Sequence, residues 1–210
     1  MTVAHWSNCG RRTMRRIVFA GLSAIGFGHA AWAGLDSGVA AYDSGDYPRA
    51  YSELRGLADT GNPVAAYLLG RMYFAGQGVA QDSAEGLKWL RLAAERGEPN
   101  AEVQLAARYE NGVGVPQGDE EAFRWYRKAA DRGSAVAQLH VGVMFAGGRG
   151  VARDLVKAHV WLNLATAALP PGAIRNSAAW LRDSVTVQLT PAQVVEAHQQ
   201  ARDWKPSTSN

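Results

Sequence analysis

The chain has 210 residues, 47% of them hydrophobic, and a formal net charge of +3. This composition is ordinary for one globular or repeat domain. Residues 1–33 contain four arginines and no Asp or Glu, which leaves the rest of the chain with 18 Lys and Arg against 19 Asp and Glu. That remainder has a formal charge of −1. It provides no net basic field for nucleic acid, so we expect no nucleic-acid partner.

Residues 1–33 have the order of a secretory signal peptide. A basic region, Arg11 to Arg16, precedes an apolar run at 17–30, and Ala31-Trp32-Ala33 is an A-x-A site. This predicts cleavage after Ala33 and export, to the periplasm first and to the cell exterior as the alternative. The apolar run is short of the roughly 20 residues of a membrane span. An uncleaved anchor is therefore the less favoured interpretation, and the only route by which we expect membrane association.

Two further observations concern this segment. Met14, followed by two arginines, is an alternative start to Met1. The single cysteine, Cys9, lies in the part predicted to be removed. The mature chain would then have no thiol for a disulfide, a thiolate zinc site or a nucleophile.

Residues 34–62 are predicted to form a divergent helix pair that caps the N-terminal end. Short helices are expected at Ser37–Ala41 and Tyr47–Ala58, joined around Ser44-Gly45-Asp46. The spacing of Tyr42, Gly45, Asp46, Tyr47 and Ala50 is similar to a tetratricopeptide unit.

A 36-residue pattern then recurs three times in register, which marks an array of two-helix units. The recurring positions hold the same or a similar residue in each unit: Tyr73, Tyr109 and Phe145; Gly76, Gly112 and Gly148; Gly78, Gly114 and Gly150; Trp89, Trp125 and Trp161. The predicted units are 63–98, 99–134 and 135–170. Each contains a first helix, a Gly-x-Gly-Val loop and a second helix, whose tryptophan should fill the gap between neighbouring units.

Capping residues support these helix boundaries. Pro63 and Pro99 suit helix starts, and Asp82-x-x-Glu85 predicts a capping box. Gly97 and Gly133 suit left-handed positions after helix ends. The paired loop glycines have two interpretations, a structural turn or a phosphate-binding loop. The turn is favoured, because no Lys-Ser/Thr pair follows, no strand precedes the motif, and it occurs three times.

Residues 171–205 depart from the repeat and are predicted to be C-terminal capping helices. The first runs from Gly172 to Val187, with Ile174, Ala178 and Leu181 on one face. The second ends near Trp204 and opens with Thr190 as N-cap and Gln193 three residues later. Residues 206–210 are expected to be a frayed tail.

The repeat resembles the Sel-one-like repeat family, a relative of the tetratricopeptide repeats. In the first unit the resemblance is carried by Ala65, Leu69, Gly70, Tyr73, Gly76, Gly78, Val79, Asp82, Trp89, Ala93, Ala94 and Gly97. The second unit departs from the family pattern at Ala106, which replaces a glycine, and at Gly118, which replaces an aspartate. The third unit departs from it at Val141, which replaces a leucine, and at Leu169, which replaces the closing glycine. The resemblance implies an all-α fold, a right-handed solenoid of antiparallel helix pairs. It also implies a scaffold or adaptor in a multiprotein complex, including complexes of the cell envelope, without cofactors.

Candidate catalytic and metal-binding chemistry is sparse. The mature chain has three histidines, of which His140 and His159 could meet across one unit, giving fewer ligands than zinc normally takes. The acids at 119–121 suit the first turn of a helix, where they complement its dipole. There is no Gly-x-Ser-x-Gly nucleophile elbow. We therefore expect no enzyme, no metal and no cofactor.

Positions that vary between units are the candidates for contact with a protein or peptide partner. They are Arg71, Phe74, Arg108, Glu110 and His140. Aromatic and arginine residues are enriched among binding hot spots, although ordinary solvated positions, with Phe74 packed on a neighbour, are the competing interpretation.

The sequence thus predicts a non-catalytic exported adaptor in a cell-envelope complex. Two alternatives stay open. One is an envelope hydrolase or small-ligand binder, because some cysteine-rich members of the resembled family are linked to penicillin binding and β-lactam hydrolysis; this chain lacks those cysteines and a Ser-x-x-Lys motif. The other is a structural subunit of an oligomer.

Overall fold

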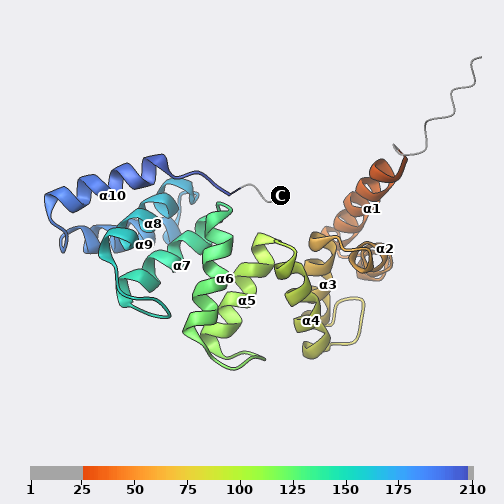
Figure 1. The fold of residues 1–210 in the computed structure, drawn as a ribbon. Helices are drawn as coiled ribbons and strands as arrows, with labels where there is room; N and C mark the ends of the chain where they lie inside the picture. The colour runs from red at the N-terminus through yellow and green to blue at the C-terminus, as the bar shows by residue number, and fades with distance from the viewer. Residues whose placement is uncertain (1–25, 208–210) are drawn as a thin grey trace, which may run out of the picture.

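The computed structural model describes residues 26–207, with side chains from residue 34 onward. This part of the chain is all-helical (Figure 1). Its ten helices are α1 (Gly26–Asp43), α2 (Tyr47–Asp59), α3 (Pro63–Ala75), α4 (Ser83–Glu95), α5 (Pro99–Asn111), α6 (Asp119–Asp131), α7 (Ala135–Gly147), α8 (Leu155–Ala168), α9 (Ala173–Thr186) and α10 (Pro191–Asp203).

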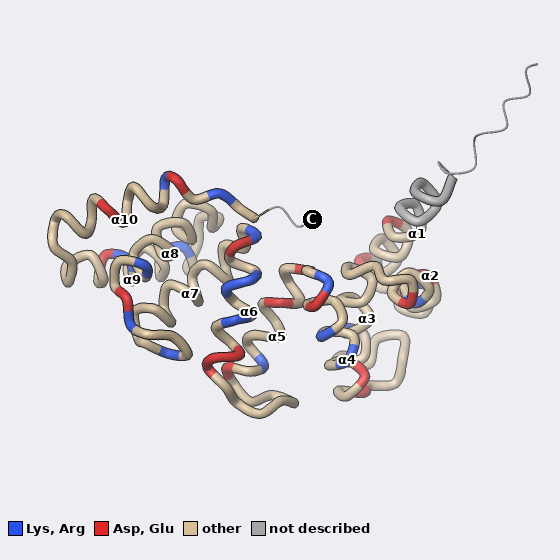
Figure 2. Tube along the Cα trace, viewed as in Figure 1, with Lys and Arg blue, Asp and Glu red and all other residues tan. Residues whose placement is uncertain are grey.

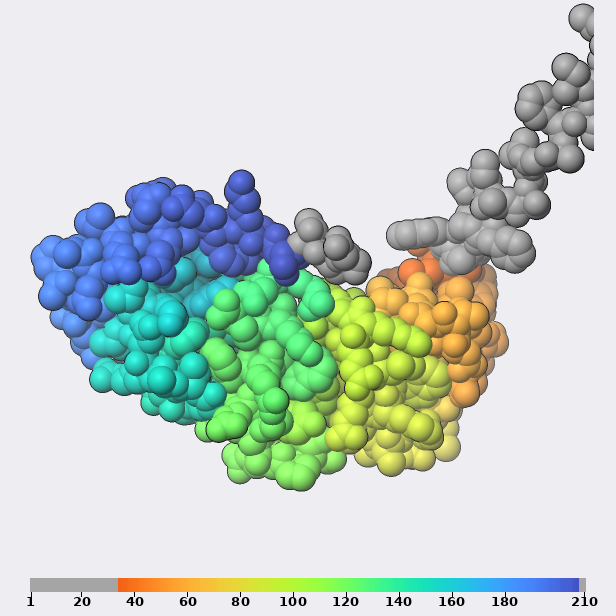
Figure 3. Space-filling view, in the orientation of Figure 1, coloured from red at the N-terminus to blue at the C-terminus, as the bar shows by residue number. Residues whose placement is uncertain are grey.

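The helices form an elongated stack. Consecutive helices pair as α1 with α2, α3 with α4, α5 with α6 and α7 with α8, and the second helix of each pair packs on the first helix of the next. Figure 3 shows the units following one another from one end of the molecule to the other. The fold is thus a helical-repeat solenoid, as the 36-residue period predicts.

Small residues let the two helices of a unit approach closely. A Cβ atom at Gly70 of α3 would lie 3.1 Å from the carbonyl oxygen of Gly86 on α4, and one at Gly142 of α7 would lie 2.7 Å from Cγ of Leu162 on α8. Many of the fully buried residues are alanines of the repeat signature, including Ala65, Ala101 and Ala137. Trp89 and Trp161 are buried, as predicted, whereas Trp125 is only half-buried.

The predicted caps are largely confirmed. Thr190 and Gln193 form the reciprocal capping box at the start of α10. Asp82 caps α4 by accepting from the amides of Ala84 and Glu85. The Glu85 half of that predicted box is wrong, because the Glu85 carboxylate binds Nζ of Lys88 at 2.7 Å instead.

The paired glycines form structural turns. Gly76, Gly112 and Gly148 end their helices in the left-handed conformation, with φ of 66°, 67° and 69°. The second glycine of each pair also has positive φ, and two of these three pack directly on the preceding unit. A Cβ atom at Gly78 would lie 2.7 Å from the backbone of Tyr47, and one at Gly150 would clash with the backbone of Asp119.

The N-terminal helix is longer than predicted. The sequence indicates a helix over Ser37–Ala41, but α1 begins at Gly26 and so crosses the predicted cleavage site at Ala33. Its run of small apolar residues contains no proline to stop it. The basic region at Arg11–Arg16 lies outside the described residues. Among residues 26–207, no helix has the length and hydrophobicity that a membrane span requires.

The C-terminal helices both pack on α8 and cover it. Ala178 of α9 is fully buried, but Ile174, which is predicted on the same face, is 58% exposed because it lies in the first turn, at the edge of the contact. The expected fraying of residues 206–210 is wrong for Pro206 and Ser207. The Ser207 amide donates to the carbonyl oxygen of Asp131 at 2.7 Å, and Pro206 packs at Gly133.

Candidate functional site

The five predicted partner-binding residues fall into three separate clusters, all on the first helices of the units. Arg71 of α3 is exposed, and its guanidinium carbon lies 5.2 Å from the ring centre of Tyr42 and 5.9 Å from that of Tyr67. Such cation–π contacts hold the arginine extended over two aromatic rings while its donors stay accessible. Binding of a partner by Arg71 stays a prediction. The exposed position of its side chain is compatible with it.

Phe74 and Arg108 contact each other across the junction between the first two units. The guanidinium carbon of Arg108 on α5 lies 3.7 Å from the ring centre of Phe74 on α3. The ring also packs on Gly86, where a Cβ atom would lie 2.7 Å from it. Burial lowers the pKa of Arg108. Both side chains are therefore engaged within the stack, and the geometry gives them a structural task.

Glu110 and His140 meet at the next junction, in a polar cluster with Tyr126 and Arg149. Glu110 accepts from the Tyr126 hydroxyl at 2.9 Å and pairs with Arg149 at 2.5 Å. Its Oε2 lies 3.7 Å from Nδ1 of His140, whose ring stacks on Tyr126 with centroids 4.3 Å apart. Three helices and one loop thus join at a single carboxylate.

The pKa values in this cluster follow from burial and hydrogen bonding. Burial acts to raise the pKa of Glu110, but the hydrogen bonds from Arg149 and Tyr126 outweigh it and the pKa lies below its usual value. Burial raises the pKa of Tyr126, with the Glu110 charge acting in the same direction. Burial lowers the pKa of His140 although Glu110 opposes this shift. The folded cluster therefore favours an ionised Glu110 beside a neutral His140.

The other candidate residues do not assemble into a catalytic or metal site. His159 lies beside His198 of α10, with ring centroids 5.0 Å apart, and not beside His140 as the sequence allows. Among the side chains described at residues 34–207, no grouping of three or more His, Cys, Asp or Glu is suited to hold a metal ion. The acids at 119–121 form the first turn of α6, and Figure 2 shows charges of both signs interleaved along the stack.

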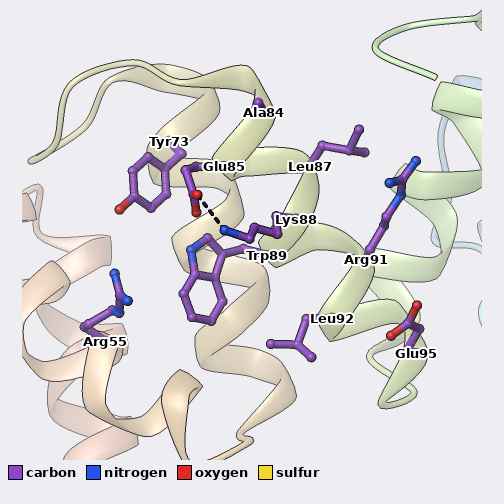
Figure 4. A pocket seen from close by; sticks show the side chains of 10 residues that line it. All are labelled: Arg55, Tyr73, Ala84, Glu85, Leu87, Lys88, Trp89, Arg91, Leu92 and Glu95. Carbon is purple, nitrogen blue, oxygen red and sulfur yellow. Dashed lines mark hydrogen bonds and ion pairs between the residues drawn. The ribbon is translucent and has the colours of Figure 1, made fainter.

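A groove that sequence reasoning missed lies between the second helices of the N-terminal pair and the first repeat. This α2/α4 groove has a volume of about 1010 Å³. In Figure 4, Arg55 of α2 faces Trp89 of α4 across it, with Tyr73 and Leu92 along its walls. The Arg55 guanidinium carbon lies 5.1 Å from the Trp89 ring centre. Lys88, Arg91, Glu85 and Glu95 add charges of both signs at its rim.

The sequence does contain a signal for this groove. Arg55, Arg91 and Arg127 are spaced by the same 36 residues as the tryptophans, and each precedes a tryptophan by 34. Because Arg55 belongs to the divergent N-terminal pair, a search confined to the three clear units does not reach it. Extending the period by one unit toward the N-terminus would have found it.

Comparison with known proteins decides the family. The sequence matches the Sel1 repeat over residues 63–98, 99–134 and 135–168. The chain belongs to the Sel1 repeat family. Proteins of this family are generally interaction modules for other proteins and are generally non-catalytic. No curated protein matches the sequence.

Solved structures agree with this assignment. The Sel1 repeat protein from Oxalobacter formigenes is 33% identical, with a TM-score of 0.56 over 74% of this chain and 99% of that one. The protein c5321, described as a protective antigen present in uropathogenic Escherichia coli strains and displaying an SLR fold, is 26% identical with a TM-score of 0.68. That match covers 82% of this chain but only 38% of c5321.

Proposed function

We propose that this Sel1 repeat protein is an exported, non-catalytic adaptor that holds a segment of another protein in a cell-envelope complex. The observation that carries the proposal is the open α2/α4 groove. Two successive helix pairs build it, and it presents aromatic, aliphatic and charged groups together. Such a mixture is characteristic of sites that bind protein segments, in which aromatic and arginine residues contribute most of the binding energy.

Export is supported by the way α1 packs. Among its described side chains, Leu35, Val39 and Tyr42 pack against the core cluster that includes Leu54 of α2, and a Cβ atom at Gly38 would lie 2.8 Å from Leu54. All four residues follow the predicted cleavage site at Ala33. Removal of residues 1–33 therefore keeps these four residues in the stack. Intact-mass measurement of the protein from the periplasmic fraction tests export, and a mature chain that retains residues 17–33 would contradict cleavage.

Affinity capture tests the adaptor function. The full chain, tagged after Asn210, is expressed in an exporting bacterial host, and envelope proteins that co-purify are identified, purified and added back. We expect a partner that binds the wild type and is lost with Arg55→Ala. Arg202→Ala is the matched control, because it removes an exposed guanidinium on α10 whose one hydrogen bond among the described residues is to Gln199, three residues away.

Thermal unfolding of each variant distinguishes lost binding from lost folding. A partner retained by Arg55→Ala but lost with Arg71→Ala would move the site to the α1/α3 surface. Hydrolysis of a β-lactam by the purified chain would contradict a non-catalytic role. Concentration-dependent self-association without any partner would favour the structural-subunit alternative.

A further inference from the structure

Three sequence-equivalent Arg–Trp pairs, spaced by 36 residues, belong to the second helices of successive units: Arg55 and Trp89, Arg91 and Trp125, and Arg127 and Trp161. In the α2/α4 site Arg55 lies over Trp89, and in the α6/α8 site Arg127 lies over Trp161 with its guanidinium carbon 4.8 Å from the ring centre. In both sites the arginine also pairs with an aspartate one turn later, Asp59 or Asp131. Each site ends at a glycine with positive φ: Gly61, Gly97 and Gly133. The repeat spacing and these glycines make the three sites comparable position by position, and the Arg–Trp and Arg–Asp contacts are shared by the α2/α4 and α6/α8 sites.

The α6/α8 site is occupied by the chain's own C-terminal segment, Trp204–Ser207. The Trp204 ring packs edge-on against Trp161 with centroids 6.0 Å apart. Carbons of Trp204 and Pro206 lie 3.9 and 3.6 Å from the position that a Cβ atom on Gly133 would take. Ser207 donates from its amide and its hydroxyl to the carbonyl oxygen of Asp131, at 2.7 and 3.1 Å. The structure therefore shows how such a site holds an extended, tryptophan-containing segment.

The segment binds there because Gly133 is left uncovered. In the other two sites an arginine of the following unit covers the equivalent glycine, and the third unit has no arginine at that position. The Arg96 guanidinium lies 3.1 Å from the Cβ position of Gly61, and that of Arg132 lies 3.0 Å from the Cβ position of Gly97. The next residue in this 36-residue series is Ala168. Its short side chain leaves Gly133 free for Trp204 and Pro206.

The α4/α6 site is closed by two basic side chains. Nζ of Lys128 lies 3.9 Å from the ring centre of Trp125. Arg132 is held by a 2.5 Å ion pair with Glu102, which is fully buried. Breaking that pair would leave a buried carboxylate without its counter-charge, which is costly. This site is therefore unsuited to admit a peptide.

The α2/α4 site differs from the α4/α6 site in both respects. Arg96 covers Gly61, but Ala66 stands where Glu102 stands in the next unit, and Arg96 has no ion pair within residues 34–207. Trp89 is buried with a relative exposure of 8%, and its indole N–H has no hydrogen-bond partner among the described atoms. The α2/α4 groove opens directly over this tryptophan. A peptide that displaces Arg96 thus displaces an exposed side chain that no ion pair holds in place.

We propose that the α2/α4 groove binds an extended peptide that carries a tryptophan and, two residues later, a proline, in the way the α6/α8 site binds Trp204–Ser207. The incoming tryptophan packs on Trp89 beside Arg55, as Trp204 packs on Trp161 beside Arg127. The residues after it pass over Gly61 and donate to the Asp59 carbonyl, the counterpart of Asp131. This inference rests on the proposed adaptor function and names the chemical class of its partner segment.

A synthetic peptide copying residues 201–207 (Ala-Arg-Asp-Trp-Lys-Pro-Ser), with blocked ends, is a direct probe. Titrated into the full-length protein, it is expected to bind saturably by calorimetry. In NMR spectra of the protein, the backbone amide shifts that change on adding the peptide are expected on α2 and α4. The same peptide with alanine for tryptophan is expected to bind at least about tenfold more weakly, because the aromatic ring is the anchor.

Two protein variants are expected to change binding in opposite directions. Arg55→Ala removes the guanidinium beside the aromatic pair and weakens binding about two- to fivefold, while Arg96→Ala uncovers Gly61 and strengthens it. Arg96 is exposed, so the second variant keeps the test valid if the first fails to fold. Arg202→Ala is expected to bind like the wild type.

Other outcomes would overturn the inference. These are no binding at about 1 mM peptide, equal binding of the alanine peptide, or shift changes confined to α6 and α8, which would mean that the peptide only displaces the chain's own tail. If the peptide fails while Arg55→Ala still abolishes capture of an envelope partner, the tryptophan-peptide class is wrong and the adaptor function stands. If both fail, the adaptor function at this groove is wrong as well.

Discussion

The two internal junctions of the repeat are built from the same signature yet sealed differently. At the junction between the first and second units, Trp125 is half-buried. Gly114 has no close contact there, since a Cβ atom added to it would lie 3.8 Å from the nearest atom, in the Arg108 guanidinium. At the junction between the second and third units, Trp161 is 4% exposed and Gly150 packs against the Asp119 backbone. The signature residues set the register of the stack. Neighbours that vary from unit to unit set how closely the units pack.

The polar contacts of these junctions differ in kind. Phe74 and Glu110 occupy the same position in successive units. The first receives Arg108 over its ring, and the second joins Arg149, Tyr126 and His140 around a carboxylate. A cation–π contact depends little on the protonation of its neighbours, whereas the carboxylate cluster responds to both salt and pH. The two junctions should therefore be separable by experiment.

The largest expected difference is at the tryptophans. Trp161→Ala removes a buried ring and should lower the free energy of unfolding by about 3–5 kcal/mol, while Trp125→Ala should cost less because the Trp125 side chain is only partly buried. Urea unfolding followed by far-UV circular dichroism measures both. Equal losses would show that the junctions are equally tight and would remove the basis of the comparison.

The second glycine of each loop gives the next largest effect. At Gly114 or Gly150, an alanine would have to adopt the left-handed backbone conformation, at a cost of roughly 1–2 kcal/mol. Gly150→Ala also forces a Cβ atom into the Asp119 backbone, so its total should reach about 3 kcal/mol or more, against about 1–2 for Gly114→Ala. The melting temperatures of the two variants, measured side by side, test this. A Gly114 variant as unstable as the Gly150 variant would contradict the open contact at Gly114.

The charged cluster comes third. Glu110→Ala removes the acceptor of Tyr126 and the partner of Arg149, at a cost of about 1.5–3 kcal/mol. Arg108→Ala at the other junction should cost about 0.5–1 kcal/mol. Repeating the unfolding in 1 M NaCl, where the Debye length falls to about 3 Å, should reduce the Glu110 effect more than the Arg108 effect. An identical salt response would indicate that the cluster is not held by charge.

The smallest effect concerns pH. His140 has a folded pKa below its ordinary value of 6.5, so the folded state binds fewer protons than the unfolded state around that value. Its contribution to stability is present above pH 6.5 and is lost as the pH falls toward the folded pKa. Glu110, with its pKa also lowered, adds a loss in the same direction below its ordinary value of 4.5.

NMR titration of the histidine ring measures this directly. The midpoint for His140 should lie below 6.5, and Glu110→Gln should lower it further by removing the charge that favours the protonated ring. A midpoint that rises in that variant would mean that the Glu110 charge does not favour the protonated ring, and a wild-type midpoint above 6.5 would mean that burial does not dominate.

Much of the fold was predictable because its signals are local. Pro63, Asp82 and Thr190 mark helix starts, and Gly76, Gly112 and Gly148 mark helix ends, since caps and positive φ depend on a few adjacent residues. The length of α1 and the position of Ser207 were not predictable in this way. Ser207 depends on a hydrogen bond to Asp131, which is distant in sequence, whereas α1 extends into a segment that the sequence assigns to a signal peptide.

The candidate site was predicted less well, for a related reason. Choosing variable positions led to Phe74, Arg108, Glu110 and His140, but variation between units does not reveal whether a side chain faces solvent or the next unit. The structure pairs Phe74 with Arg108 and Glu110 with His140 across junctions. Arg55 and Trp89, which line the groove, are 34 residues apart and meet only when the helices stack.

The sequence by itself determined the unit, its 36-residue period, the turns and the caps, because these follow from backbone conformation and helical periodicity within one unit. Only the tertiary structure decided which of three equivalent Arg–Trp sites is filled, closed or open. That outcome depends on residues distant in sequence: Trp204 at Gly133, Glu102 with Arg132, and Arg96, which has no ion pair within the described chain, at Gly61. Contacts of that kind are set by the three-dimensional stacking of helices, which local sequence patterns do not encode.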